Sequence, residues 1–333
     1  PILRVHTAGS VGGSTGIVAA SYIQSGMFER VLVSTFEKQS ESNAMWALST
    51  TVPYAPLINA GAGGYFTPYM REYKRRFNVP EHIGRIVAVK DRLNALKNPY
   101  AHLHIPDINL EMVEKSPMLW DPLTFLESCP SSDGACSLVI SSERSVTANQ
   151  LPAWIHSASM RSEPTMYAGR DAVNPQAGSE CAKDVYKKAG IKDPIKEIDC
   201  AEIYVPFSWY EPMWLENLLL TDIGQGWLMT EKGHTSLEGK FPVNMSGGVL
   251  SSNPIGASGL LRFGEAAQQV RNKAYEVIDF LNLKHLANEL AGNLSGGQKK
   301  LLELGRTMMV DAKLVLLDEV GAGVNRTLLK EIG

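Results

Sequence analysis

The proline, tryptophan and cysteine residues of this chain are confined to its first three quarters. All 18 prolines, all six tryptophans and all four cysteines lie at or before Pro254. Only two aromatic residues, Tyr275 and Phe280, follow residue 271, and the remainder of that stretch is rich in leucine. The shift predicts two units of different origin, residues 1–271 and 272–333, and no proline- or glycine-rich linker separates them.

Composition and charge exclude several classes of protein. The 32 basic and 35 acidic residues give a net charge of −3, which offers no electrostatic basis for binding nucleic acid. The longest apolar runs, such as Leu314 to Leu317, are far too short to span a membrane. Four cysteines without a CxxC pair do not make a disulfide framework, so we expect a reduced, cytoplasmic protein.

Strand-like and helix-like segments alternate along the first unit. Residues 30–34, 137–141 and 198–204 are predicted as strands, and residues 17–25, 65–77, 81–96 and 260–270 as helices. Residues 100–120 contain proline breakers and are predicted to be irregular. This alternation predicts an α/β layered fold.

Two glycine- and serine-rich loops, residues 6–14 and 247–259, each precede a predicted helix. Helix N-termini attract anionic groups, which makes both loops candidate binding sites. Neither loop matches the phosphate-loop pattern, because the first lacks the lysine that this pattern requires. The alternative, that the glycines only permit tight packing of helix and strand, stays open.

Seven short motifs follow one another along the first unit, and most contain glycine, proline or asparagine. They are Val5-His6 with Gly26 and Glu37; Asn98-Pro99-Tyr100-Ala101; Ser116-Pro117 with Asp121-Pro122-Leu123; Ser132-Asp133-Gly134-Ala135; Glu202-Ile203-Tyr204-Val205-Pro206-Phe207; Gly247-Gly248; and Asn253-Pro254-Ile255-Gly256-Ala257-Ser258-Gly259.

The order of these motifs resembles the thiolase superfamily, in particular thiolases of the sterol-carrier-protein type. The resemblance implies a thiolase-like αβαβα layered fold that is incomplete in this chain. It divides the first unit into remnants of the N-terminal half (residues 1–50 and 131–150), a loop domain (residues 51–130) and the C-terminal half (residues 151–271).

The departures from the family pattern fall on its catalytic positions. The nucleophilic cysteine position falls on Gly9, with Ser10 beside it as the remaining candidate, and neither supplies the thiolate that thiolysis requires. The family's oxyanion-hole histidine is replaced by Asn253, whose amide can donate a hydrogen bond but cannot act as a base. The asparagine of the third family motif is replaced by Tyr204.

These departures favour C–C bond cleavage over thiolysis. Thiolase-like lyases that act on CoA esters of steroid side chains show similar changes. The resemblance therefore implies a retro-aldol or acyl-transfer reaction on a lipid- or steroid-type acyl-CoA. Tyr204 would move the proton and Asn253 would hold the enolate, while the CoA ester is expected to lie along Gly247, Gly248, Gly256 and Ser258. The family also implies a homodimer and a zinc-ribbon/OB-fold partner.

Other chemistry-bearing residues of the first unit are expected to be structural. Cys129 and Cys136 are predicted to be inert buried thiols, although one of them could be a displaced nucleophile. His102 and His104 have no third ligand nearby, so we expect no metal site. A non-catalytic, CoA-ester-binding scaffold is the alternative function for the unit.

The second unit carries a different pattern. Residues 294–298 read Leu-Ser-Gly-Gly-Gln, a helix is predicted over residues 299–309, and an apolar strand over residues 314–317 ends in Asp318-Glu319. This resembles the ATP-binding subunit of ABC transporters, particularly those for branched-chain amino-acid uptake. The resemblance implies that Ser295, Gly296, Gly297 and Gln298 contact a γ-phosphate, that Asp318 holds Mg²⁺ through water and that Glu319 polarises the attacking water.

No G-x-x-x-x-G-K-[ST] sequence occurs in the 333 residues, so binding of ATP and Mg²⁺ is expected only in an intact domain. Both units lack parts of the families that they resemble. We therefore expect a join of two incomplete reading frames rather than an evolved fusion. A fragment of an amino-acid transporter ATPase remains the second alternative function.

Overall fold

The strand predicted at residues 30–34 extends further in the computed structural model and pairs with the strand predicted at 137–141. The structure describes residues 2–7, 9–41, 61–147, 152–163, 170–171, 173–287, 289 and 291–309. Strands β1 (Arg30–Lys38) and β4 (Asp133–Ser141) form an antiparallel two-stranded sheet in which Leu32 faces Val139. A second sheet joins β2 (Met118–Trp120) to β3 (Leu123–Thr124).

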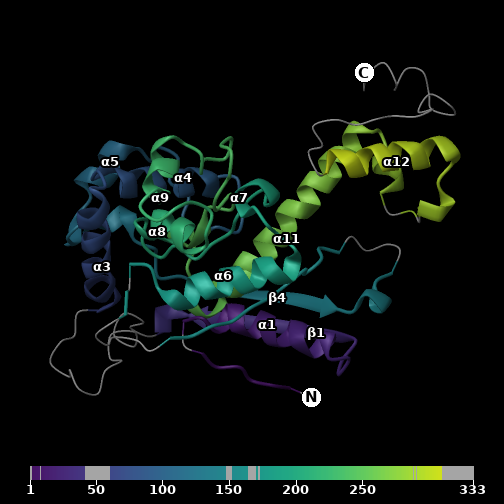
Figure 1. The fold of residues 1–333 in the computed structure, drawn as a ribbon, viewed down its shortest axis with the longest axis horizontal. Helices are drawn as coiled ribbons and strands as arrows, with labels where there is room; N and C mark the ends of the chain where they lie inside the picture. Colours follow the sequence, from purple (N-terminus) through teal and green to yellow (C-terminus); the bar gives the residue numbers. More distant parts are fainter. Residues whose placement is uncertain are drawn as a thin grey trace.

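Helices make up most of the remaining structure (Figure 1). The longer ones are α1 (Val11–Gln24), α3 (Gly61–Phe77), α4 (His82–Ala95), α6 (Gln176–Ala189), α8 (Tyr210–Asn217), α11 (Ile255–Phe280) and α12 (Gly296–Met308). Short helices are α5 (Leu110–Lys115), α7 (Pro194–Glu197), α9 (Gly226–Glu231) and α10 (Gly248–Ser251). The helices predicted at 17–25, 65–77, 81–96 and 260–270 are thus confirmed, within longer or slightly shifted bounds.

Helices α1 and α11 cover one face of the β1–β4 sheet. Ala19, Val33 and Leu260 are buried where the three elements meet. The opposite face of the sheet carries exposed apolar side chains, among them Leu32 and Phe36, which are 70% and 76% exposed. The alternation along β1 therefore buries one face of the sheet, as expected for a strand covered by helices on one side.

The two glycine-rich loops bring α1 and α11 into close contact. A Cβ atom at Gly12 would lie 2.8 Å from the backbone nitrogen of Leu260, and one at Gly259 would lie 2.3 Å from that of Gly13. No larger side chain fits at either position without movement of a backbone. Tight packing, one of the two interpretations of these loops, is thus present at the α1–α11 crossing.

A second core fills the helical part of the chain. Trp209, Tyr73 and Met213 are fully buried there, and Val205 and Phe207 belong to the same core. Two predictions for this part of the chain are wrong. Residues 198–204 form no strand, because only Ala201 makes a bridge, to Val243. The segment 100–120, predicted to be irregular, contains α5 and β2.

Helix α11 runs without a break across residue 271, the predicted limit of the first unit. Beyond it, α12 folds back onto the end of α11, and Leu281, Leu283 and Leu301 are buried between them. Figure 1 shows this helical pair at the far end of α11, away from the β1–β4 sheet. Across the described residues, no helix has the length and apolar character needed to cross a membrane.

Candidate functional site

Tyr204 and Asn253 lie together, although 48 positions separate them in the sequence. Asn253 is 2% exposed and immediately precedes Pro254, the N-cap of α11. Its side chain lies close enough to the Tyr204 hydroxyl to lower the pKa of the phenol, which is the effect of a donor that stabilises the phenolate. The amide of Asn253 therefore lies beside the tyrosine oxygen.

The Asn253 amide also donates a hydrogen bond to a thiol. Its Nδ2 donates to the Sγ of Cys129 over 3.0 Å. Cys129 reaches this place because its backbone N–H donates to the carbonyl of Pro206, 2.9 Å away, and Ser128 forms a bridge with Phe207. A tyrosine hydroxyl, a thiol and an asparagine amide thus share one corner of the protein, at the start of α11.

Three neighbours hold Asn253 in this orientation. Ser258, one turn into α11, donates its hydroxyl to Oδ1 of Asn253 over 2.7 Å, which leaves Nδ2 to face Tyr204 and Cys129. The backbone N–H of Asn253 donates to Oγ of Ser132 at 3.0 Å, and Nε2 of Gln39 donates to its carbonyl at 2.6 Å. The amide is therefore fixed before any ligand arrives, as an oxyanion-binding group requires.

Both proton-bearing groups beside Asn253 stay neutral at physiological pH. Burial raises the pKa of Tyr204, and the nearby Cys129 adds to the rise while the hydrogen bond with Asn253 opposes it. Burial raises the pKa of Cys129 to about 11, against the lowering effects of the Asn253 hydrogen bond and the Arg92 charge. A nucleophilic cysteine needs the opposite shift, because the thiolate is its reactive form.

The expected cysteine position lies near this corner but presents no reactive group. A Cβ atom at Gly9 would lie 3.4 Å from Cγ2 of Ile255, two residues after Asn253. Ser10 precedes α1, is exposed, and donates its hydroxyl to the carbonyl of Thr7 over 2.8 Å. The start of α1 thus lies beside the start of α11, with glycine where the family has its nucleophile.

The four residues proposed to lie along the CoA ester fall in two places. Gly256 and Ser258 belong to the first turns of α11, where the N–H of Gly256 donates to Oε2 of Glu37 over 3.2 Å. Gly247 and Gly248 precede and begin α10, with φ angles of +91° and +57°. A Cβ atom at Gly247 would lie 2.5 Å from that of Ala95, so this pair of glycines packs α10 against α4.

The predicted ATP signature begins α12. Ser295 is the N-cap: its Oγ accepts the N–H of Gln298 over 3.3 Å, and Oε1 of Gln298 accepts the N–H of Ser295 over 2.8 Å. This reciprocal pair is a capping box, and Gly296 and Gly297 form the first turn behind it. Asp318 and Glu319 lie outside the described residues.

Sequence reasoning missed part of the site. Ser132 and Gln39 reach Asn253 only through the tertiary fold, and Cys129 was expected to be inert. Ser132 also contacts Nδ1 of the exposed His102, 2.8 Å away, so a histidine considered as a metal ligand instead binds a hydroxyl. Within the described residues, no group of three or more His, Cys, Asp or Glu side chains could hold a metal ion. Only Ser132 had a signal in the sequence, since it begins the Ser132-Asp133-Gly134-Ala135 motif.

Comparisons with known proteins find thiolase-like relatives of this chain. Residues 158–301 match the family described as "Thiolase C-terminal domain-like". Sterol carrier protein 2 of Rattus norvegicus is 27% identical over 301 residues, which cover 82% of this chain and 53% of that protein. The benzoylsuccinyl-CoA thiolase subunit BbsB of Thauera aromatica is 27% identical over 278 residues, which cover 82% of this chain and 71% of that subunit. The chain spans about half the length of the sterol carrier proteins that it matches.

Two solved structures share the fold. The "Ltp2-ChsH2(DUF35) aldolase" is 25% identical, with a TM-score of 0.69 over 81% of this chain and 72% of that one. Human mitochondrial 3-ketoacyl-CoA thiolase is 14% identical, with a TM-score of 0.58 over 80% of this chain and 71% of that one, a likeness of fold alone. These similarities do not show the ATP-binding assignment of residues 272–333, which stays a prediction. Together, these similarities support the assignment of this chain to the thiolase superfamily.

Proposed function

We propose that this chain cleaves a C–C bond of a β-hydroxyacyl-CoA ester by a retro-aldol reaction. The observation that carries the proposal is the amide of Asn253. Ser258 fixes it so that Nδ2 donates to Cys129 beside Tyr204, where a substrate oxygen would receive its N–H groups. Both neighbours are neutral, so the site offers hydrogen-bond donors and a mobile proton but no thiolate.

The proposed step needs one proton to move from the substrate oxygen to carbon. The Tyr204 oxygen takes the proton of the β-hydroxyl and gives up its own hydroxyl proton as the bond between Cα and Cβ breaks, and Cβ becomes a ketone or aldehyde carbonyl. The bonding electrons pass into the thioester as an enolate, whose oxygen accepts the N–H groups of Asn253. The proton released by Tyr204 goes to Cα, so the products are a carbonyl compound and a shortened acyl-CoA, and the phenol is neutral again. A neutral phenol relays a proton in this way without ionising, which agrees with its raised pKa.

The state of Cys129 favours this lyase over acyl transfer. Acyl transfer through an enzyme-bound thioester needs a thiolate, and at a pKa of about 11 only about one thiol in a thousand is ionised at pH 8. Cys129 instead accepts a hydrogen bond from Asn253. Gly9, at the family's cysteine position, carries no side chain.

The substrate and partner are proposed from the relatives. Benzoylsuccinyl-CoA thiolase is named for a CoA ester, and the solved aldolase pairs one component with a DUF35 protein. We propose a lipid- or steroid-type acyl-CoA as substrate, a homodimer as the assembly, and a zinc-ribbon/OB-fold protein as a partner. For residues 272–333 we keep the proposal of an ABC ATPase fragment, which by itself adds no ATP hydrolysis.

The test compares two reactions of the purified chain. It is incubated with a β-hydroxyacyl-CoA that carries a tertiary β-carbon, and ketone and shortened CoA ester are measured by mass spectrometry. In parallel it receives the matching 3-ketoacyl-CoA with free CoA. We expect equal amounts of ketone and shortened ester in the first reaction and no thiolysis in the second. Thiolysis without ketone release would contradict the proposal, and binding of the ester without turnover in either reaction would favour a scaffold.

A further inference from the structure

The segment that carries Tyr204 has little secondary structure of its own. The last backbone bonds before the tyrosine involve Ala201, whose N–H donates to the carbonyl of Pro242 at 3.0 Å and whose carbonyl accepts the N–H of Asn244 at 2.8 Å. From residue 202 onward no strand ladder continues. A segment without backbone pairing would allow the phenol of Tyr204 to move. Side chains must therefore fix residues 202–204.

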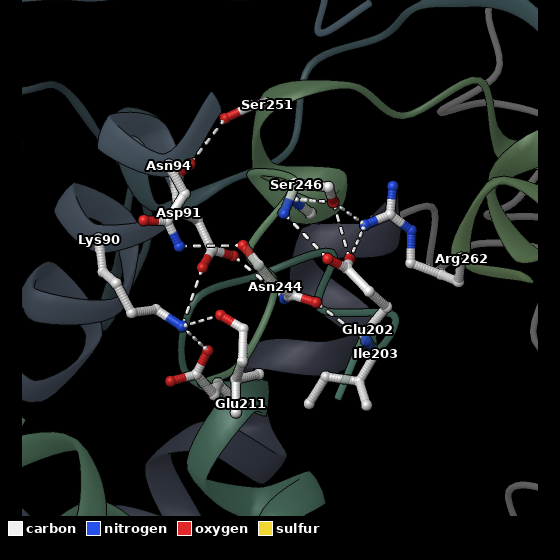
Figure 2. A network of polar contacts seen from close by, with 12 residues as sticks. Lys90, Asp91, Asn94, Glu202, Ile203, Glu211, Asn244, Ser246, Ser251 and Arg262 are labelled. Atoms are coloured by element: carbon white, nitrogen blue, oxygen red, sulfur yellow. Dashed lines mark hydrogen bonds and ion pairs between the residues drawn. The ribbon is translucent and has the colours of Figure 1, made fainter. Parts of the chain in front are cut away.

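Asn244 supplies the first of these contacts. Its Oδ1 accepts the backbone N–H of Ile203, the residue before Tyr204, over 2.9 Å, and its Nδ2 donates to Oδ2 of Asp91 over 3.2 Å (Figure 2). Its carbonyl accepts Nδ2 of Asn94 at 3.0 Å. Asn244 is fully buried and has a φ of +54°, a conformation that asparagine adopts more readily than most residues.

The opposite flank of the segment is fixed through Glu202. Its carboxylate accepts the N–H of Ser246 at 2.9 Å, the Ser246 hydroxyl at 2.7 Å and Nη1 of Arg262 at 2.7 Å. Figure 2 shows Glu202 and Ile203 between Arg262 on one side and Asn244 on the other. The carbonyl of Tyr204 accepts Nε1 of Trp214 at 2.9 Å. Three consecutive residues are thus held, and only the phenol is left to reach Asn253.

We propose that Asn244 is a positioning residue for Tyr204: through the N–H of Ile203 it fixes the backbone from which the phenol reaches Asn253. The inference rests on the proposed function of Tyr204. Asp91 sets the direction of the Asn244 amide, because its Oδ2 accepts the Nδ2 hydrogen and so leaves Oδ1 for Ile203. Lys90 lies 3.0 Å from the other oxygen of Asp91 and fixes that carboxylate in turn.

The variant Asn244→Gly removes the side chain and keeps a residue that tolerates the positive φ. We expect kcat for ketone release to fall about 10- to 100-fold with KM unchanged, since a displacement near 1 Å costs this much in rate. In the Tyr204→Phe background the same change should have no further effect on kcat. The matched control is Asn217→Ala, another buried asparagine with two hydrogen bonds, which should not change kcat.

A conservative exchange separates positioning from stability. Asn244→Asp alone places a carboxylate against Asp91 and should lower kcat as Asn244→Gly does. Combined with Asp91→Asn, it restores an acceptor for Ile203 and a donor–acceptor pair between positions 91 and 244, so kcat should return to within about threefold of wild type. An Asn244→Gly effect that is fully additive with Tyr204→Phe would overturn the inference.

A second readout does not depend on turnover. In protein labelled with ¹³C at tyrosine Cζ, the Tyr204 resonance is identified by its loss in Tyr204→Phe. Asn244→Gly should shift that resonance. Asn217→Ala should leave it at its wild-type position. If the wild type releases no ketone but Asn244→Gly shifts the Tyr204 resonance, the result would support the positioning role and reject the proposed function. An unshifted Tyr204 resonance in Asn244→Gly would reject the positioning role, whatever the activity.

Discussion

Replacing Tyr204 with phenylalanine should lower kcat for ketone release by a factor of ~10²–10⁴, because the ring remains and the transferable proton is lost. Binding of the CoA ester should change little, since the phenol is assigned to the proton and not to the ester. Tyr186→Phe is the matched control. The Tyr186 hydroxyl, on α6, donates to the carbonyl of Leu218 at the end of α8 over 2.7 Å. Retention of wild-type kcat by Tyr204→Phe would remove Tyr204 from the mechanism.

The pH profile gives this experiment a second readout. Burial raises the pKa of Tyr204, so the neutral phenol persists to a higher pH than in a free tyrosine. Because the neutral form is the active one, kcat should be constant through neutral pH and fall only as pH passes the raised pKa. A rate that increases between pH 6 and 8 would indicate a different, ionising base.

Replacing Lys90 with methionine should destabilise the protein by ~3–5 kcal/mol, the usual effect of leaving buried charge without its partner. The Lys90 ammonium lies 2.6 Å from Glu211 and 3.0 Å from Asp91, and both carboxylates are fully buried. Burial lowers the pKa of Lys90, but the two carboxylates more than offset this and raise it overall. Without the ammonium, two like charges would share a buried site.

Urea unfolding measures this loss. The control is Lys115→Met, whose exposed ion pair with Glu111 should contribute no more than ~1 kcal/mol. If Lys90→Met unfolds at the same urea concentration as Lys115→Met, the buried network does not depend on its central cation.

Much of the local structure follows from sequence pattern alone. Short apolar runs at residues 30–34 and 137–141 located β1 and β4, and helix-like stretches located α1, α3, α4 and α11. Residues 198–204 have the composition of a strand but no neighbouring strand among the described residues. The N–H of Ile203 and the carbonyl of Tyr204 therefore bind the side chains of Asn244 and Trp214 instead. Which partner satisfies a backbone group depends on the tertiary fold, and this is beyond what periodicity can predict.

The site was predicted in part. Tyr204 and Asn253 came from motif order, and the structure brings them into contact. Cys129 joins them because residues 128–129 pair with residues 206–207, a long-range contact without a local signal. Its role differs from that of an isolated buried thiol only because Asn253 directs an N–H at its sulfur.

The motif at residues 295–298 shows how one pattern serves two interpretations. Serine followed three residues later by glutamine is part of the ATP signature and is also the spacing of a capping box. In the structure both side chains bind backbone N–H groups at the start of α12. Local helix formation therefore accounts for this pair of contacts without a nucleotide.

The central claim is that Asn253 holds an enolate of a CoA ester while Tyr204 moves the proton. The measurement that tests it most directly is exchange of the α-hydrogens of the shortened acyl-CoA product in D₂O in the presence of the ketone product, followed by mass spectrometry. We expect the wild-type chain to incorporate deuterium at Cα, and Asn253→Ala to slow this exchange by ~10²–10³, the usual effect of losing one oxyanion donor. Equal exchange rates in wild type and Asn253→Ala, or no exchange in wild type, would contradict the claim.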